Sequence, residues 1–199
     1  MIVTAHPDLD SLTHHAARRL QALLGEENAE LAHLAQEGFD PRFTAADRQN
    51  YLVRGSADAA VVAEQQRVAR AEHVVLVFPV YWWSMPALLK GWVDRVFIAG
   101  WAFDYDEQDR VVPMLGGLTA HLLALSGTSA GSFARHGYTE SFSIQVERGV
   151  IDFCGIRRGV TAFVHESESE DRGAVAAEIE VAVARVAEGI ERVETAEVT

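Results

Sequence analysis

The sequence predicts an α/β domain with a doubly wound, five-stranded parallel sheet and helices on both faces. Residues 74–78 form a continuous apolar run rich in β-branched side chains, as expected of a strand buried on both faces. From Pro86, apolar residues recur at spacings of three and four, which predicts an amphipathic helix. Strand-like and helix-like segments alternate along the chain, and this order produces a parallel sheet. The length of 199 residues suits one domain, residues 1–199.

The elements are predicted from their patterns. Strands are expected at residues 1–5, 29–34, 74–78, 121–126 and 159–164, and a short hairpin at 101–112. Helices are expected at residues 10–25, 58–71, 86–97, 141–154 and 175–193. The segment 49–56 is ambiguous. The first helix shows an apolar stripe of Leu12, Ala16, Leu20 and Leu23, and the fourth shows one of Phe142, Val146, Val150 and Phe153.

Composition and charge narrow the class of protein. The formal net charge is −12, which disfavours a nucleic-acid partner. No apolar run approaches the roughly 20 residues that span a bilayer, so we expect no membrane insertion and a cytoplasmic location. The chain has one cysteine, Cys154, which excludes an internal disulfide and which we expect to be a buried, unreactive thiol.

Ligand binding is expected at the carboxyl ends of the strands, where loops form the crevice of an open α/β sheet. Tyr81, Trp82 and Trp83 follow the central strand in succession. Neighbours on an extended loop cannot all face the core, so these rings indicate a flat ligand. The loop HPDLDSLT precedes the first helix, whose N-terminus offers N–H groups to an anion. On spacing alone, a simple N-cap at Asp10 or Ser11 explains the pattern better than an anion site does.

The string FPVYWWSMPALLKGWVDRVF, followed by GWAFDY, resembles the flavodoxin-like NAD(P)H:quinone oxidoreductases. This family includes quinone reductases, modulator of drug activity B proteins and ancillary flavoproteins of bacterial potassium efflux systems. The resemblance extends back to Ala5-His6-Pro7 and forward to Asp152-Phe153-Cys154-Gly155. It implies a flavin cofactor, FMN or FAD, with NAD(P)H as co-substrate.

The resemblance also implies which residues contact the flavin. Those expected at its phosphate are Ser11, Leu12 and Thr13, with His6 beside them. Those expected at its ring are Pro79, Val80, Tyr81, Trp82 and Trp83, and at its pyrimidine end Leu125, Ser126, Gly127 and Thr128. Many family members place a Tyr and a His near the ring; the His position falls on His136. The Tyr position holds Phe133, which cannot donate a hydrogen bond, so Tyr138 is expected to substitute.

The implied activity is two-electron reduction of quinones or related aromatic acceptors by NAD(P)H, in a ping-pong cycle of hydride transfer, by a homodimer. Two other functions stay open: a regulatory flavoprotein subunit of a potassium efflux system, and a one-electron carrier. His136 is alternatively a plain surface histidine. The residues leave the choices between FMN and FAD, and between NADH and NADPH, undecided.

Two further chemistries are disfavoured. Gly127-Thr128-Ser129-Ala130-Gly131 matches the G-x-S-x-G elbow of serine hydrolases, with Asp152 and His165 in the matching order. However, no helical pattern is expected to begin directly after Ser129. The eight histidines show no H-E-x-x-H spacing, and His14 and His15 are expected to be solvated on their helix, so no metal site is predicted.

Overall fold

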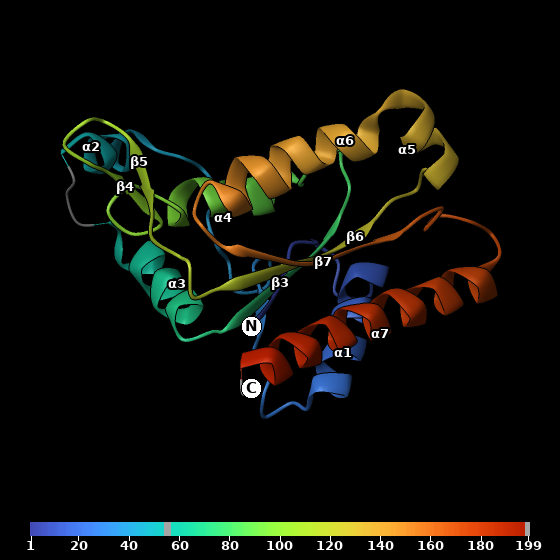
Figure 1. Ribbon diagram of the computed structural model, residues 1–199. Coiled ribbons are helices and arrows are strands. Elements are labelled where there is room, and N and C mark those ends of the chain that lie inside the picture. Colours follow the sequence, from blue (N-terminus) through green and yellow to red (C-terminus); the bar gives the residue numbers. More distant parts are fainter. Residues whose placement is uncertain (54–56, 198–199) are drawn as a thin grey trace.

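The computed structural model describes residues 1–53 and 57–197 and contains a five-stranded parallel sheet (Figure 1). The strand order is β2-β1-β3-β6-β7. The bounds are Ile2–Thr4 for β1, Leu31–His33 for β2, His73–Pro79 for β3, Thr119–Leu125 for β6 and Arg157–Val164 for β7. The predicted fold class is therefore confirmed.

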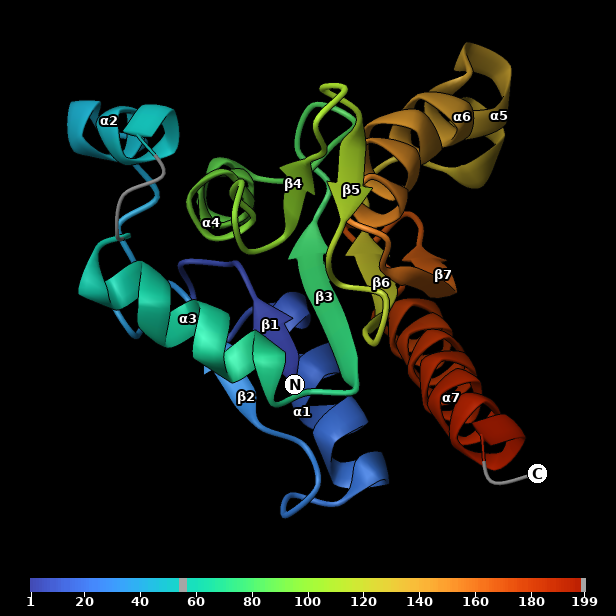
Figure 2. The ribbon, with the colours of Figure 1, turned by 60° about the vertical axis from the view of Figure 1, so that its left-hand side comes forward.

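Helices cover both faces of the sheet, as Figures 1 and 2 show. Helices α1 (Leu12–Leu24) and α7 (Arg172–Glu197) pack on one face, while α3 (Ala59–Ala69), α4 (Ala87–Val96) and the π-helix η1 (Ser143–Asp152) pack on the other. Short helices α5 (Ala130–His136) and α6 (Tyr138–Phe142) lead into η1. In β3, Val75 and Val77 face α1 and α7, and Leu76 and Phe78 face the opposite layer. This alternation explains why its sequence is apolar throughout.

The buried stripe of α1 differs at its end from the prediction. Ala16 and Leu20 are buried as expected, but Leu23 is 51% exposed. Leu24 packs against the core instead, because it continues the spacing of four that joins Ala16 to Leu20. The helix ends at Gly25, whose φ of 87° favours glycine.

The fourth predicted helix is wound as a π-helix over most of its length. Its hydrogen bonds run from i to i+5, and this wider winding moves the buried position from Val150 to Ile151. Phe153 was expected on the buried side, but it is 39% exposed and packs edge-on against Phe103, with ring centroids 5.0 Å apart. Glu147 accepts hydrogen bonds from Thr161 and Arg158 and so ties η1 to β7.

The predicted hairpin is confirmed as β4 (Phe103–Tyr105) paired antiparallel with β5 (Val111–Pro113). Helix α2 (Ala45–Val53) contains no buried residue, and its Tyr51 interacts with Tyr105 of β4. Of the ambiguous segment 49–56, residues 49–53 are helical and residues 54–56 lie outside the described residues. Helix α2 is held on the body by Arg95 of α4, which bonds Asp47.

Two further predictions concern the burial of Cys154 and the length of the apolar helices. Cys154 is 3% exposed, and burial raises the pKa of its thiol to about 11, so the buried thiol is confirmed. Among residues 1–53 and 57–197, no helix combines the length and apolarity needed to cross a bilayer.

Candidate functional site

The three loops predicted to bind a ligand meet at the carboxyl edge of the sheet. The register pairs Thr4 with Val77 and Pro79 with Leu125, so β1, β3 and β6 end side by side. The backbone N–H of Val80 donates to the carbonyl of Leu125 at 2.7 Å, which joins two of the loops directly. The expected convergence is observed, while the binding roles of the individual residues stay predictions.

The loop before α1 is folded as a compact turn that exposes the start of the helix. Ser11 is the N-cap, and its hydroxyl accepts from the N–H of His14 at 3.3 Å. The ring of His6 accepts from the N–H of Asp8 at 3.0 Å, which fixes the preceding turn. Thr13 is buried and Leu12 is half-buried, so backbone N–H groups and Ser11 are the groups best placed for an anion.

The expectation that His14 and His15 are both solvated is wrong for His14. His15 is exposed, but His14 is only 1% exposed because its ring packs under the loop, against the ring of His33, with centroids 4.9 Å apart. The helical period alone does not predict this burial, because a spacing of six places His14 about 120° around the helix from Leu20, at the edge of its buried side. Among the described residues, no group of three or more His, Cys, Asp or Glu side chains could hold a metal ion.

The aromatic loop after β3 is a tight turn closed by two backbone hydrogen bonds between Tyr81 and Ser84, each 3.1 Å long. At its tip, Trp82 and Trp83 both adopt positive φ, 48° and 63°, a region that bulky residues rarely enter. Trp82 is 92% exposed. A strained turn that presents a large ring to solvent is typical of a surface that a ligand or partner covers.

Trp83 forms a stack with Tyr138 from the start of α6. The two rings lie 3.6 Å apart at an interplanar angle of 9°, and the exposed ring of His136 lies 5.5 Å from Tyr138. The structure therefore brings both predicted catalytic residues to the aromatic loop. Phe133 is 1% exposed and packs against His165 and Phe163. Phe133 belongs to the core beneath this stack and carries no hydroxyl, so Tyr138 supplies the phenol beside His136.

The loop after β6 is held in place by hydrogen bonds within itself and to the loop after β7. Ser126 is buried, and its hydroxyl accepts from the N–H of Thr128 at 3.1 Å. Ser167, in the loop after β7, donates its N–H to the carbonyl of Ser126 at 2.9 Å. A side chain at the exposed Gly127 would meet the carboxylate of Glu168 at 3.0–3.3 Å. The pairing of β7 with β6 places the loop of residues 166–170 at the site.

The elbow of a serine hydrolase is not formed, although one argument against it was wrong. Helix α5 does begin directly after Ser129, which is its N-cap. However, Ser129 has an ordinary φ of −70°, whereas the elbow holds its nucleophile in a strained turn. Asp152 is paired with Arg158, and the ring of His165 contacts the carbonyl of Thr128.

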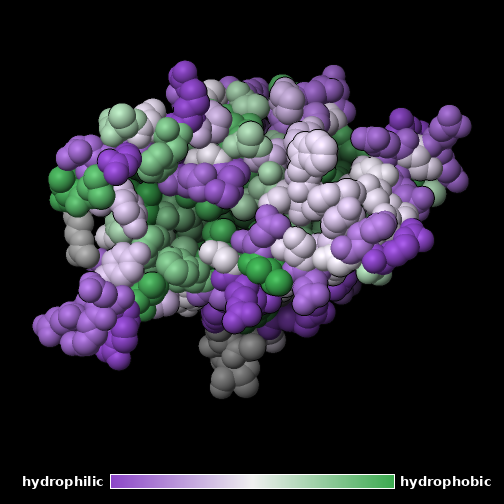
Figure 3. All heavy atoms as spheres, turned by 90° about the horizontal axis from the view of Figure 1, so that it is seen from above, coloured by the Kyte–Doolittle hydropathy of each residue, from purple (hydrophilic) through white to green (hydrophobic). Residues whose placement is uncertain are grey.

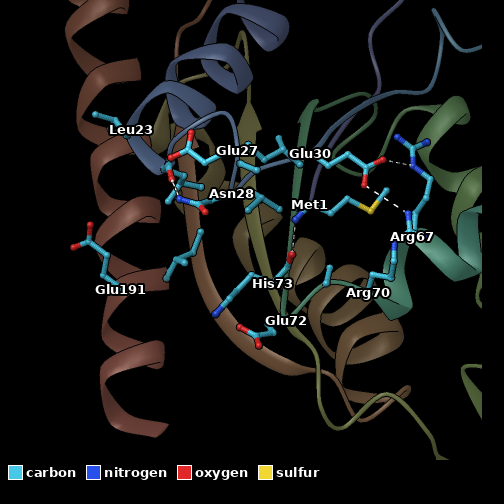
Figure 4. Close-up of a pocket in the computed structure, with 16 residues that line it drawn as sticks. Met1, Leu23, Glu27, Asn28, Glu30, Arg67, Arg70, Glu72, His73 and Glu191 are labelled. Carbon is cyan, nitrogen blue, oxygen red and sulfur yellow. Dashed lines mark hydrogen bonds and ion pairs between the residues drawn. The ribbon is translucent and has the colours of Figure 1, made fainter. Parts of the chain in front are cut away.

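A cavity of about 720 Å³ lies at the opposite edge of the sheet (Figure 4). It is lined by residues at the amino ends of β1 and β3, such as Ile2 and His73, and by charged side chains such as Glu30 and Arg67, which pair at 2.7 Å. Because ligands of open α/β sheets bind at the carboxyl ends of the strands, this cavity is separate from the loops described above.

The residues present fit a flavin in three respects. The exposed Trp82 and the half-buried Trp83 form an apolar aromatic wall, a helix N-terminus lies at the next strand end, and the loop 125–128 contains the exposed Gly127. These features lie at one edge of the sheet, at the point where the strand order reverses.

The comparisons with known proteins agree with this architecture. The family model described as "Flavodoxin-like fold" matches residues 1–188. Ribosyldihydronicotinamide dehydrogenase [quinone] from Homo sapiens is 36% identical over 128 residues, which cover 59% of this chain and 53% of the relative. The solved structure of the NAD(P)H:quinone oxidoreductase from Methanothermobacter marburgensis superposes with a TM-score of 0.81 at 22% identity and covers 92% of this chain and 93% of that one.

A further solved structure is an FMN-dependent NADH-azoreductase from Bacillus anthracis in complex with FMN, with a TM-score of 0.70, 18% identity and coverage of 96% of this chain and 97% of that one. The chain therefore belongs to the flavodoxin-like fold family. The chain spans about half the length of the human relative it matches, and at the identities of the two structures the likeness concerns the fold.

Proposed function

We propose that this protein is a flavin-dependent NAD(P)H oxidoreductase that reduces quinones or related aromatic acceptors by two electrons. The observation that carries the proposal is the exposed, strained Trp82-Trp83 turn beside the capped N-terminus of α1. The names of the human and M. marburgensis relatives, which both include quinone as acceptor, support the same chemistry. The proposal includes a cytoplasmic location, where NAD(P)H is available.

Each of the three loops would bind a different part of the cofactor. The N–H groups that follow Ser11 would bind the phosphate, aided by the positive end of the α1 dipole. Backbone groups of Leu125–Thr128 would contact the polar edge of the ring system. Both FMN and FAD satisfy this arrangement, and the FMN held by the B. anthracis relative supports FMN.

A bound flavin supplies the acceptance of hydride from NAD(P)H and its delivery to the acceptor. The chain would contribute an apolar wall, Trp82 and Trp83, that excludes water and orders a flat substrate. We propose that NAD(P)H and the acceptor use this one surface in turn, which gives ping-pong kinetics. His136 would donate a hydrogen bond or proton from beside Tyr138, and such a positioned donor contributes about 10²–10⁴ in rate.

The proposal is tested by His136→Ala, with Arg135→Ala as a matched control because Arg135 is its exposed neighbour on α5. We expect quinone reduction by His136→Ala to fall by about 10²-fold or more, with unchanged flavin content and unchanged activity in the control. Reduction of quinone at the wild-type rate by His136→Ala would show that this histidine is only a surface residue.

We further propose that two copies of the chain associate through an exposed apolar face. Figure 3 shows apolar side chains gathered on the side of the molecule that carries α2 and the hairpin. The exposed apolar residues in these elements and directly beside them are Phe43, Tyr51, Leu52, Val53, Tyr105, Val111, Val112 and Met114. Patches of this kind mark association surfaces. Sedimentation equilibrium is expected to give a dimer, and a dimer that persists unchanged in Leu52→Lys would contradict this choice of face.

A further inference from the structure

A chain of hydrogen-bonded rings lies directly under the loop proposed to hold the flavin phosphate. The ring of the buried His14 contacts the carbonyl of His6 through Nε2 at 3.0 Å and the Nδ1 atom of His33 through its own Nδ1 at 3.0 Å. His33 Nδ1 also lies 2.9 Å from the hydroxyl of Thr4. These contacts connect β1, β2 and α1 to the loop, and the proposed activity uses none of them.

Hydrogen-bond chemistry decides where the protons are. A carbonyl only accepts, so Nε2 of His14 carries a proton, and a neutral His14 must then accept at Nδ1. The proton between the two Nδ1 atoms therefore belongs to His33. An additional proton is accommodated without moving either ring: His33 takes it up at Nε2, and the shared proton shifts to His14 Nδ1. His14 is then the cation and still donates to the carbonyl of His6.

The surroundings keep this pair neutral in the free protein. Burial is the largest cause that lowers the pKa of His14, and His33, His6 and Arg18 lower it further, while the bond to the His6 carbonyl raises it. Burial also lowers the pKa of His33, with Arg18 acting in the same direction and Glu37 opposing it. A dianion placed at the start of α1 would add the attraction that these surroundings lack.

We propose that the His14–His33 pair takes up a proton when a phosphate ester binds to the loop of residues 6–13, and that flavin affinity is thereby linked to pH. The inference rests on the proposed flavin function. A neutral pair gives the weaker phosphate site, and the protonated pair, with its charge on His14, gives the stronger one. His14 and His33 act as positioning residues, since His14 also holds the His6 carbonyl in place.

The sign of the linkage follows from the two states. Because the bound state has the higher pKa, affinity for the phosphate ester rises as the pH falls through that pKa and levels off below the pKa of the free protein. A shift of one pKa unit corresponds to about a tenfold change in the dissociation constant. An ordinary structural role for the pair would weaken binding equally at every pH.

The test is calorimetric titration of the flavin-free full-length protein with FMN, near pH 6.5, in buffers of different ionisation enthalpy. His14→Gln retains an amide that donates to the carbonyl of His6 but does not titrate, and His33→Gln removes the entry point for the proton. His15→Gln is the matched control, because His15 is the exposed neighbour in the same helical turn. FMN phosphate itself titrates near pH 6, so the readout is the difference in proton number between wild type and variant.

We expect wild type and His15→Gln to take up about half a proton more than His14→Gln or His33→Gln. The two variants should keep only the pH dependence of the FMN dissociation constant that the phosphate's own titration causes. Riboflavin, which has no phosphate, should show no such difference. Equal proton numbers in wild type and His14→Gln, with FMN bound by both, would overturn this inference and leave the proposed function intact. Absence of binding of both FMN and FAD to the wild type would overturn both.

Discussion

Helix α2 has no buried residue of its own, so its attachment to the rest of the protein depends on polar contacts. A variant of one such contact therefore tests directly how much free energy an ion pair contributes to folding. Arg95, whose side chain is 6% exposed, bonds Asp47 at 3.1 Å and donates to the carbonyl of Asp40 at 2.8 Å. The Asp47 side chain is 10% exposed. In Arg95→Met the apolar stem is retained, but the carboxylate of Asp47 is left without its cation in a half-buried position.

Removal of one partner from a buried ion pair costs about 3–5 kcal/mol. Asp47 keeps hydrogen bonds from the N–H and hydroxyl of Thr44, so we expect the free energy of unfolding of Arg95→Met to fall by about 2–3 kcal/mol. The control is Lys90→Met on the same helix. Its partner Asp94 and Lys90 itself are 41% and 52% exposed, so the expected loss is below about 0.5 kcal/mol.

Urea unfolding followed by circular dichroism measures both variants, and hydrogen exchange reports the protection of the α2 amides. We expect that protection to fall in Arg95→Met and to remain in Lys90→Met. The double variant Arg95→Met/Asp47→Asn should regain about 1 kcal/mol, because it removes the uncompensated charge. Equal stabilities for Arg95→Met and Lys90→Met would refute the view that Arg95 anchors α2.

Three more predictions concern single sites. Ser11→Ala removes the N-cap of α1 and should lower the free energy of unfolding by about 1 kcal/mol, which thermal melts measure. Ser11→Asp should keep the cap but weaken FMN binding, because its carboxylate repels the phosphate, and FMN titration measures this loss. Burial, with His73 as the next cause, lowers the pKa of His121 from 6.5 to about 4. As the pH falls from 6.5 to 4, the unfolded chain binds a proton at this histidine and the folded chain does not, so the free energy of unfolding should fall by about 3 kcal/mol. A flat pH profile of urea midpoints would contradict this. Cys154, with its pKa near 11, should react with thiol reagents at neutral pH only after unfolding, and rapid labelling of the native protein would show that the thiol is accessible.

The fold could be predicted from the sequence where one period dominates a segment. The apolar run at residues 74–78 identified β3, and the spacing of Val175, Ile179, Val183 and Val186 identified α7, whose residues at these positions are buried. The same reasoning failed where backbone geometry departs from the usual period. The π-helix η1 buries Ile151 instead of Val150, and no local pattern in the sequence distinguishes the two windings.

The candidate site was predicted in its loops but not in its contacts. Parallel strands end at a common edge, so the loops after β1, β3 and β6 were expected to meet there, and they do. The stack of Trp83 on Tyr138 joins residues 55 positions apart in the chain, and such pairings depend on how α5 and α6 pack. The burial of His14 against His33 likewise depends on the register between α1 and β2.

The measurement that tests the account most directly is anaerobic. The protein is purified with its flavin, its visible spectrum is recorded, NADH or NADPH is added, and a quinone follows. The account predicts that the flavin band is bleached rapidly by the pyridine nucleotide and restored by the quinone, without an accumulating semiquinone. A bound flavin that neither nucleotide reduces would contradict the proposed enzyme and favour a regulatory flavoprotein, and a stable semiquinone would favour a one-electron carrier.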